Sequence, residues 1–196
     1  MTDNRHQPDH GRRWLVGAGC AGLAALGGNL FAGRLRAAGP AAAAPAPDVT
    51  IENFSPAGAS LGLVHVAKVV KSEAEWRSQL STLAYQVTRR AGTEAAFSGE
   101  YANNHGDGLY HCVCCETALF DSRTKFESGT GWPSFWQPIS AKNVAISSDT
   151  SFGMQRDAVS CKRCDSHLGH VFNDGPRPTG LRYCMNSVSL KFTTRA

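Results

Sequence analysis

Two short runs near the start of the folded part of the chain place apolar residues at helical spacing. Their members are Trp76 and Leu80, then Leu83, Val87 and Ala91. Side chains four residues apart share one face of a helix. Ser72 followed by Glu75 has the form of a capping box, and Gly92 is a suitable helix stop. The pattern predicts two short helices that pack against the rest of the domain and carry no chemistry.

From Phe97 onward, short runs rich in β-branched and aromatic residues alternate with clusters of Gly, Asn, Asp and Pro, which is typical of strands joined by turns. The candidate strands are Leu109–Val113, Ala118–Asp121, Val144–Ser148, Arg156–Cys161, His170–Phe172 and Arg182–Phe192. Helices followed by a mainly antiparallel sheet indicate an α+β domain, which we place at residues 72–196.

The last candidate strand changes phase. Apolar side chains alternate up to Met185 and again from Val188 onward, but one residue out of step. Because successive side chains of a strand point to opposite faces, the slip predicts a β-bulge or a break. Such irregularities often redirect side chains at active sites, and Cys184 and Asn186 lie at this one.

Residues 1–43 have the features of a twin-arginine export signal. Arg12-Arg13 precede a Gly- and Ala-rich uncharged run, and cleavage near Ala43 is plausible. The signal predicts a periplasmic or exported protein that meets the membrane only during export. An uncleaved anchor is the alternative, since the run is long enough to span a bilayer. A lipoprotein role for Cys20 fits poorly, because this residue lies early in the apolar run.

Residues 44–71 begin with Pro and Ala and predict a linker or extension with one short strand, and Val64 to Val70 has an ambiguous strand-like composition. Five of the 20 basic residues, but only two of the 16 acidic ones, lie in residues 1–43. Most of the formal net charge of +4 therefore belongs to the signal. The remainder is nearly neutral, which gives no reason to propose nucleic acid as a partner.

Two Cys-x-x-Cys pairs, Cys112 with Cys115 and Cys161 with Cys164, have the spacing of metal ligands. Each pair lets two thiolates converge on one tetrahedral ion, and four thiolates complete a structural zinc site. Disulfides are the alternative in an oxidising compartment. Folding and metal loading before twin-arginine export would protect the thiols from oxidation. Cys114 lies inside the first pair, either as a neighbour that points away from the metal or as a second redox thiol.

Cys184 is the candidate nucleophile. It follows Arg182 by two residues and shares a strand face with this cation, which favours the thiolate. An inert buried thiol is the alternative. His167 and His170 follow the second cysteine pair, and we expect proton donors there, because four cysteines already suffice for one zinc ion. Trp132 lies in an irregular loop, either as an anchor or as one wall of an apolar pocket.

Together, these residues resemble the B-type methionine sulfoxide reductases, also called peptide-methionine (R)-S-oxide reductases. The resemblance covers about Ser72 to Phe192. It rests on the stretches VTRRAGTEAAFSGEY, CVCC, FESGTGWPSFW, GMQR, CKRCDSHLGHVFNDGPRPTG and RYCMNSVSL. It implies a compact, zinc-stapled, mainly antiparallel β domain with small N-terminal helices, which reduces peptide-bound methionine-R-sulfoxide to methionine.

The resemblance also implies roles for single residues. Cys184 is the nucleophile that becomes a sulfenic acid, and Trp132 packs against the substrate methyl group. The other implied site residues are His167, His170, Asn186 and Arg182, of which the arginine supports the thiolate. The implied zinc ligands are Cys112, Cys115, Cys161 and Cys164. Substrates would be oxidised proteins or peptides, and a thioredoxin-like dithiol would restore the enzyme.

One departure from the family pattern concerns this last step. Many members carry a resolving cysteine in or near the Ser-Gly-x-Gly-Trp loop, where this chain has Thr130. We therefore expect an external dithiol to reduce Cys184 directly, with Cys114 as the alternative resolving residue. Two rivals come from other classes of protein: a zinc-ribbon binding module with a merely buried Cys184, and a disulfide-stapled secreted domain.

Overall fold

The computed structural model describes residues 46–149 and 156–196. They belong to Ala43–Ala196, the second of the two units into which the chain divides. The predicted export signal, Cys20 and the first three residues of the GMQR stretch lie outside the described residues. Within the described ranges, no helix has both the length and the apolar character needed to cross a bilayer.

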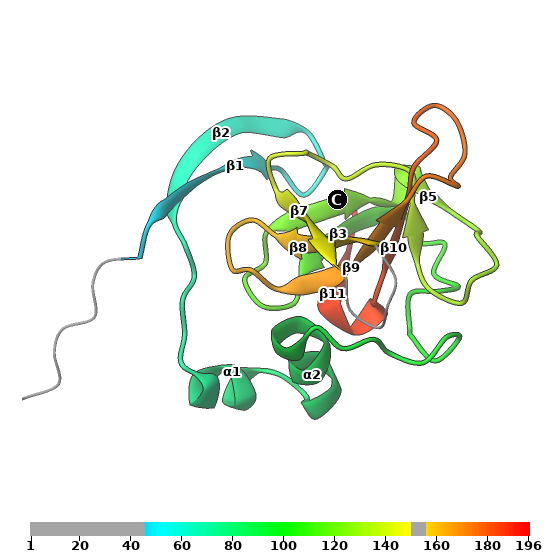
Figure 1. Ribbon diagram of the computed structural model, residues 1–196. Helices are drawn as coiled ribbons and strands as arrows, with labels where there is room; N and C mark the ends of the chain where they lie inside the picture. The colour runs from blue at the N-terminus through cyan, green and yellow to red at the C-terminus, as the bar shows by residue number, and fades with distance from the viewer. Residues whose placement is uncertain (1–45, 150–155) are drawn as a thin grey trace, which may run out of the picture. The chain divides into compact units, whose positions relative to one another are not determined.

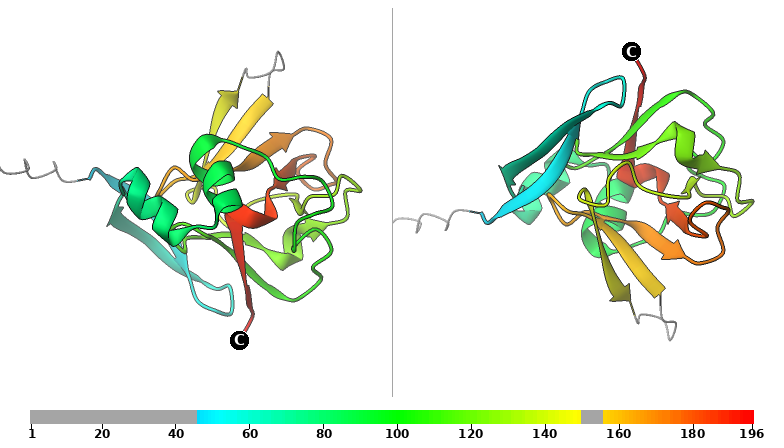
Figure 2. Two further views of the ribbon diagram at one scale, coloured as in Figure 1. Left: turned by 90° about the horizontal axis from the view of Figure 1, so that it is seen from below. Right: turned by 90° about the horizontal axis from the view of Figure 1, so that it is seen from above.

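Both predicted helices are present, as α1 (Glu73–Gln79) and α2 (Thr82–Arg90) (Figure 1). The Glu75 N–H donates to the Ser72 hydroxyl, and the Ser72 N–H donates to the Glu75 carboxylate, so the capping box is confirmed. The helix α2 packs against β9 (His167–Phe172) and the 3-10 helix η3 (Ser187–Ser189) (Figure 2).

The buried face of α2 differs from the expected one. Its members are Ala84, Tyr85, Val87 and Thr88. Leu83, which we expected on the buried face with Val87, is 47% exposed. On the helix surface the buried residues extend from Val87 toward Ala84 and Thr88, and Leu83 lies on the other side of Val87. The helix ends at Ala91, whose left-handed φ of 52° provides the turn one residue before Gly92.

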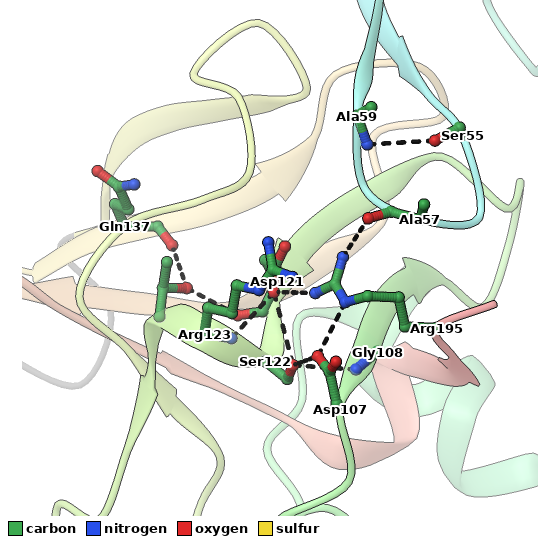
Figure 3. Close-up of polar contacts among 11 residues, drawn as sticks. Ser55, Ala57, Ala59, Asp107, Gly108, Asp121, Ser122, Arg123, Gln137 and Arg195 are labelled. Carbon is green, nitrogen blue, oxygen red and sulfur yellow. Dashed lines mark hydrogen bonds and ion pairs between the residues drawn. The ribbon is translucent and has the colours of Figure 1, made fainter.

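The expectation of a linker with one short strand was wrong. Residues 48–67 form an antiparallel hairpin of β1 (Asp48–Phe54) and β2 (Ser60–Ala67). Asn143 anchors its middle, because the Asn143 amide accepts from the Glu52 N–H and donates to the Glu52 carbonyl, both at 2.8 Å. Arg195 anchors its tip by donating to the Ala57 carbonyl and to the Asp107 and Asp121 carboxylates (Figure 3).

The remaining strands form two antiparallel sheets. The larger has the order β5-β6-β10-β9-β8-β7, and the smaller has the order β11-β3-β4. Their bounds are β3 Gly108–Cys112, β4 Ala118–Asp121, β5 Lys125–Phe126, β6 Ser134–Phe135, β7 Val144–Asp149, β8 Arg156–Cys161, β10 Arg182–Met185 and β11 Leu190–Thr194. The predicted α+β class with a mainly antiparallel sheet is confirmed, whereas the short strands β5 and β6 were not foreseen.

The predicted phase slip is a break between the two sheets. Strand β10 belongs to the larger sheet, η3 (Ser187–Ser189) follows it, and β11 belongs to the smaller sheet. Each sheet sets independently which face of its strands is buried. The alternation of apolar residues therefore restarts when the chain crosses from one sheet to the other. Cys184 therefore lies near the end of β10, just before the crossing.

Aromatic side chains fill the core beneath this crossing. The rings of Phe120 and Phe135 stack with centroids 4.4 Å apart, and Tyr110 meets Phe135 edge-on at 5.0 Å. Phe135 and Tyr110 are fully buried. Because such aromatic pairs add to the free energy of apolar burial, they tie β6 of the larger sheet to β3 and β4 of the smaller one.

Candidate active site

Strand pairing places Cys184 between a hydroxyl and an imidazole. On β10, Cys184 lies directly opposite Ser134 of β6 on one side and His170 of β9 on the other. Residues directly opposite each other in a sheet point to the same face. Ser134, Cys184 and His170 thus form one row across three strands, which we call the thiol row.

A cavity of about 120 Å³ opens at the thiol row. Its lining residues are Thr93, Trp132, Arg156, Gly169, His170, Phe172, Cys184, Met185 and Asn186. Two wider hollows, of about 710 Å³ and 410 Å³, adjoin it and share Arg156 with it. The arrangement suits a small side chain that enters the central cavity while its polypeptide lies along the hollows on either side.

The environment of the Cys184 sulfur differs from the sequence expectation. Burial raises the pKa of the Cys184 thiol, and the Thr130 hydroxyl and the Arg182 guanidinium oppose this rise only in part. The cation is committed elsewhere, since Arg182 donates two hydrogen bonds to the Asp174 carboxylate, at 2.8 and 2.7 Å. Arg182 thus favours the thiolate as expected, but burial outweighs its effect.

The two histidines have different surroundings. His170 Nε2 lies 2.9 Å from Asp149 Oδ2, and the Arg156 guanidinium lies 3.2 Å from the same oxygen. The Asp149 carboxylate therefore orients the His170 ring. His170 lines the cavity beside Cys184.

His167 lines the wider hollow of about 710 Å³ and is absent from the lining of the small cavity. Burial, followed by the neighbouring His170, lowers the pKa of His167 to about 4. Its Nε2 is buried without a hydrogen-bond partner among the described residues. At neutral pH this imidazole is uncharged. Its ring meets that of His170 edge-on, with centroids 5.3 Å apart, so the two histidines are neighbours, of which only His170 lines the small cavity.

Trp132 and Asn186 both line the cavity, and both are hydrogen-bonded to Glu94. The Trp132 indole N–H donates to the Glu94 carbonyl at 3.2 Å. The Asn186 amide accepts from the Glu94 N–H at 2.9 Å and donates to the Leu168 carbonyl at 3.0 Å. Asn186 therefore lines the cavity with an amide whose polar atoms already bind the backbone.

Glu94 is the site residue that sequence reasoning missed. Its side chain is 2% exposed, and its carboxylate accepts from the Ser187 N–H at 2.6 Å and from the Val188 N–H at 3.0 Å. The backbone of the same residue holds Trp132 and Asn186. One residue thus joins the Trp132 loop to the segment that follows Cys184. Its only signal was its place in the VTRRAGTEAAFSGEY stretch, which carried the resemblance without assigning it a role.

The four paired cysteines converge on one point. The Sγ atoms of Cys112, Cys115, Cys161 and Cys164 all lie within 4.8 Å of one another. Across the pairs, Cys112 and Cys164 are 3.6 Å apart, and Cys115 and Cys161 are 3.5 Å apart. Disulfides have a sulfur–sulfur distance of about 2.05 Å, whereas thiolates around a tetrahedral ion with bonds of about 2.3 Å are separated by distances close to these. The cluster can hold a metal ion.

The cluster is built from the same turn twice. The Glu116 N–H donates to the Cys112 carbonyl at 2.8 Å, and the Asp165 N–H donates to the Cys161 carbonyl at 2.9 Å. Glu116 and Asp165 both have left-handed backbones, with φ of 60° and 56°. One turn joins β3 to β4 in the smaller sheet, and the other joins β8 to β9 in the larger sheet. A bound ion would therefore link the two sheets.

Cys114 and Cys184 do not share an environment. The Cys114 thiol is 4% exposed and donates to the Ser166 hydroxyl at 3.5 Å. The Cys184 sulfur instead lies 3.8 Å from the Thr130 hydroxyl. All six cysteines of the described residues are free, which contradicts the disulfide-stapled alternative.

Comparison with known proteins gives consistent matches. The SelR domain family matches residues 80–194, a range that begins after the β1–β2 hairpin. The "Peptide methionine sulfoxide reductase MsrB" of Thioalkalivibrio sulfidiphilus (strain HL-EbGR7) is 61% identical over 116 residues, which cover 59% of this chain and 85% of the relative. The protein of the same name from Herminiimonas arsenicoxydans is 57% identical over 125 residues, 64% of this chain and 91% of the relative. That from Pseudomonas aeruginosa (strain UCBPP-PA14) is 55% identical over 130 residues, 66% of this chain and 98% of the relative.

Proposed function

This chain belongs to the SelR domain family, that of the B-type methionine sulfoxide reductases, and we propose that Cys184 is the thiol with which it reduces peptide-bound methionine-R-sulfoxide. The protein is a peptide-methionine (R)-S-oxide reductase. The observation that carries the role of Cys184 is the thiol row, which presents one sulfur to a small cavity between a hydroxyl and an imidazole.

The reaction transfers one oxygen atom. The Cys184 thiolate attacks the sulfur of the protonated sulfoxide and forms a transient sulfur–sulfur bond. This bond and the sulfur–oxygen bond then break as the hydroxyl passes to the Cys184 sulfur, so that Cys184 becomes a sulfenic acid and methionine leaves as the thioether. A proton must reach the sulfoxide oxygen to make its sulfur electrophilic. His170 is the better donor, because it lines the cavity beside Cys184 and Asp149 orients its ring, whereas His167 is uncharged at neutral pH and does not line this cavity.

The lining of the cavity supplies binding. Trp132 and Phe172 offer apolar surfaces to the methyl group of the substrate. Asn186 contributes to the lining, and Arg182 adds a positive potential near the sulfur from its place beside Asp174. The hollows on both sides, joined at Arg156, provide room for the polypeptide of an oxidised protein or peptide.

Zinc is the metal that the four-cysteine cluster suits best, since four thiolates are a common set of structural zinc ligands. Cys112, Cys115, Cys161 and Cys164 would fill all its coordination positions. Such an ion contributes stability and takes no part in the reaction.

The oxidised enzyme needs an external reductant. Two thiols of a thioredoxin-like dithiol reduce the Cys184 sulfenic acid to the thiol, with release of water and formation of a disulfide on the dithiol. The loop in which a resolving cysteine would lie carries Thr130 instead.

Export through the twin-arginine route would place this repair activity in the periplasm. The support is the Arg12-Arg13 pair before a soft apolar run. Replacing both arginines with lysine should leave the protein in the cytoplasm on cell fractionation. Unchanged export of that variant would contradict the proposal.

The decisive experiment replaces Cys184 with serine. We expect Cys184→Ser to lose at least about three orders of magnitude of turnover, because hydroxyl groups are far weaker nucleophiles than thiolates. The assay measures reduction of a methionine-R-sulfoxide peptide with dithiothreitol as the reductant. The matching methionine-S-sulfoxide peptide is the control. Metal content and thermal stability should match the wild type. Substantial turnover in this folded variant would exclude Cys184 as the nucleophile, and the zinc-ribbon alternative predicts no turnover in either protein.

A further inference from the structure

A continuous chain of hydroxyl groups runs from the Cys184 sulfur to a backbone carbonyl. The Thr130 hydroxyl lies 3.8 Å from the Cys184 sulfur and 2.8 Å from the Ser128 hydroxyl. The Ser128 hydroxyl lies 2.7 Å from that of Ser134, which donates to the Trp132 carbonyl at 3.2 Å. Ser134 is also the member of the thiol row opposite Cys184.

The protons of this chain can be counted. Each hydroxyl has one proton to donate and two lone pairs to accept. While Cys184 is a thiol, its proton can point to Thr130, that of Thr130 to Ser128, and that of Ser128 to Ser134. The Ser134 proton points to the Trp132 carbonyl, so every proton has an acceptor.

Loss of the thiol proton requires only one rotation. The Thr130 hydroxyl turns its proton to the charged sulfur, and Ser128 keeps two acceptors in reach, the oxygens of Thr130 and Ser134. No heavy atom has to move. The chain therefore satisfies both charge states of Cys184, which a fixed carbonyl or a fixed N–H could not do.

The backbone fixes Thr130 in this place. Gly129 and Gly131 on either side have left-handed φ values of 71° and 87°. Gly131 packs against Phe97 so closely that an added Cβ would lie 2.7 Å from the Phe97 nitrogen, and the Phe97 N–H donates to the Gly131 carbonyl at 2.8 Å. Since Phe97 holds the loop at Gly131, next to Thr130, the Thr130 hydroxyl is aimed at the sulfur before substrate arrives.

The sulfur needs such a donor. Cys184 is half-buried, and Arg182, the cation whose charge acts on it, is bound at two points by Asp174. We propose that Thr130 is a further catalytic residue, whose hydroxyl donates a hydrogen bond to the Cys184 thiolate and is held ready by Ser128 and Ser134. This inference rests on the proposed role of Cys184 as the nucleophile.

The test compares Thr130→Val with Thr130→Ser. Valine keeps the branched shape and removes the hydroxyl, whereas serine keeps the hydroxyl. Alkylation of Cys184 by iodoacetamide is followed across pH by mass spectrometry of the Cys184 peptide. We expect the midpoint for Thr130→Val to rise by about one pH unit and alkylation at pH 7 to slow about tenfold, the size of one hydrogen bond to a charged group. Thr130→Ser should restore the wild-type profile.

Single-turnover reduction of a methionine-R-sulfoxide peptide provides the second measurement, and it should slow by a similar factor in Thr130→Val. A wild-type midpoint in folded Thr130→Val would overturn the inference. If valine prevents folding, Ser128→Ala decides instead: a shift in the same direction supports the chain, and an unchanged profile overturns it. The alkylation profile reports on the hydrogen bond even if turnover persists in Cys184→Ser, so the two proposals can fail separately.

Discussion

The four-cysteine cluster and the thiol row use cysteine side chains in opposite ways. In the cluster, four sulfurs lie on two turns of the same kind, all within 4.8 Å of one another. In the thiol row, one sulfur lies on a straight strand and has hydroxyls, an imidazole and a cavity as partners. The two arrangements show that the neighbours decide what a cysteine does, since each thiolate needs either a metal or hydrogen-bond donors nearby.

The two regions also differ in how they are held. Each turn of the cluster is fixed by hydrogen bonds within a few residues, such as that from the Glu116 N–H to the Cys112 carbonyl. The surroundings of Cys184 are fixed by contacts between distant parts of the chain, such as that between Glu94 and Ser187. Substitutions should therefore separate stability from activity.

The largest effect on stability should follow from breaking the cluster. Cys161→Ser removes one of four ligands, and we expect loss of the bound metal and of a free energy of unfolding on the order of several kcal/mol. Metal analysis and urea denaturation measure these effects. The folded fraction should still alkylate Cys184 normally, because the thiol row does not depend on Cys161 for its side-chain partners.

A metal-free wild-type protein with undiminished stability would contradict this prediction. It would mean that the four thiols pack well as neutral groups and that the turns alone join the two sheets. A chelator titration on the wild type, monitored by melting temperature, gives the same answer without a substitution.

Glu94→Gln should cost less stability than Cys161→Ser, and it should lower the activity without loss of metal. The glutamine amide keeps one acceptor and turns an NH₂ group toward the N–H of either Ser187 or Val188. One buried donor is then unpaired, which costs about 1–3 kcal/mol of stability. Since Ser187 follows directly on the Cys184 strand, we also expect kcat/KM to fall while metal content stays at the wild-type level.

Glu100→Gln is the matched control, because Glu100 lies in the same loop and is exposed. It should leave stability and kcat/KM unchanged. Equal behaviour of the two variants would show that the Glu94 carboxylate does not hold the cavity together.

The sequence predicts local features well. The Cys-x-x-Cys spacing brought out the whole cluster, because its geometry arises within each turn. The phase slip after Met185 predicted the break between the sheets, because alternation reports directly on which face is buried.

Features that depend on pairing between distant segments were not predictable. Glu94 and Ser134 acquire their places only when residues about 50 to 90 positions away fold beside them. The expected effect of Arg182 on the thiolate was correct in sign, but burial of Cys184 outweighs it, and the sequence shows neither this burial nor the pairing of Arg182 with Asp174. The β1–β2 hairpin was missed because most of β2 is exposed and lacks a clear apolar face.

The smallest effect should come from replacing Cys114, whose sulfur belongs to neither the four-cysteine cluster nor the thiol row. It belongs to the first cysteine turn, yet its sulfur is outside the four-cysteine cluster and binds Ser166. The Gln79 amide holds its carbonyl at 2.9 Å, and its neighbours Cys112 and Cys115 face the cluster. A disulfide with Cys184 would require Cα atoms about 4.4–6.8 Å apart, so the segment would have to leave these partners. We therefore expect Cys114→Ser to keep wild-type turnover.

One equivalent of substrate without reductant should leave a sulfenic acid on Cys184 that dimedone traps. A quantitative Cys114–Cys184 disulfide, with turnover lost in Cys114→Ser, would instead make Cys114 the resolving residue and remove the distinction between the two regions.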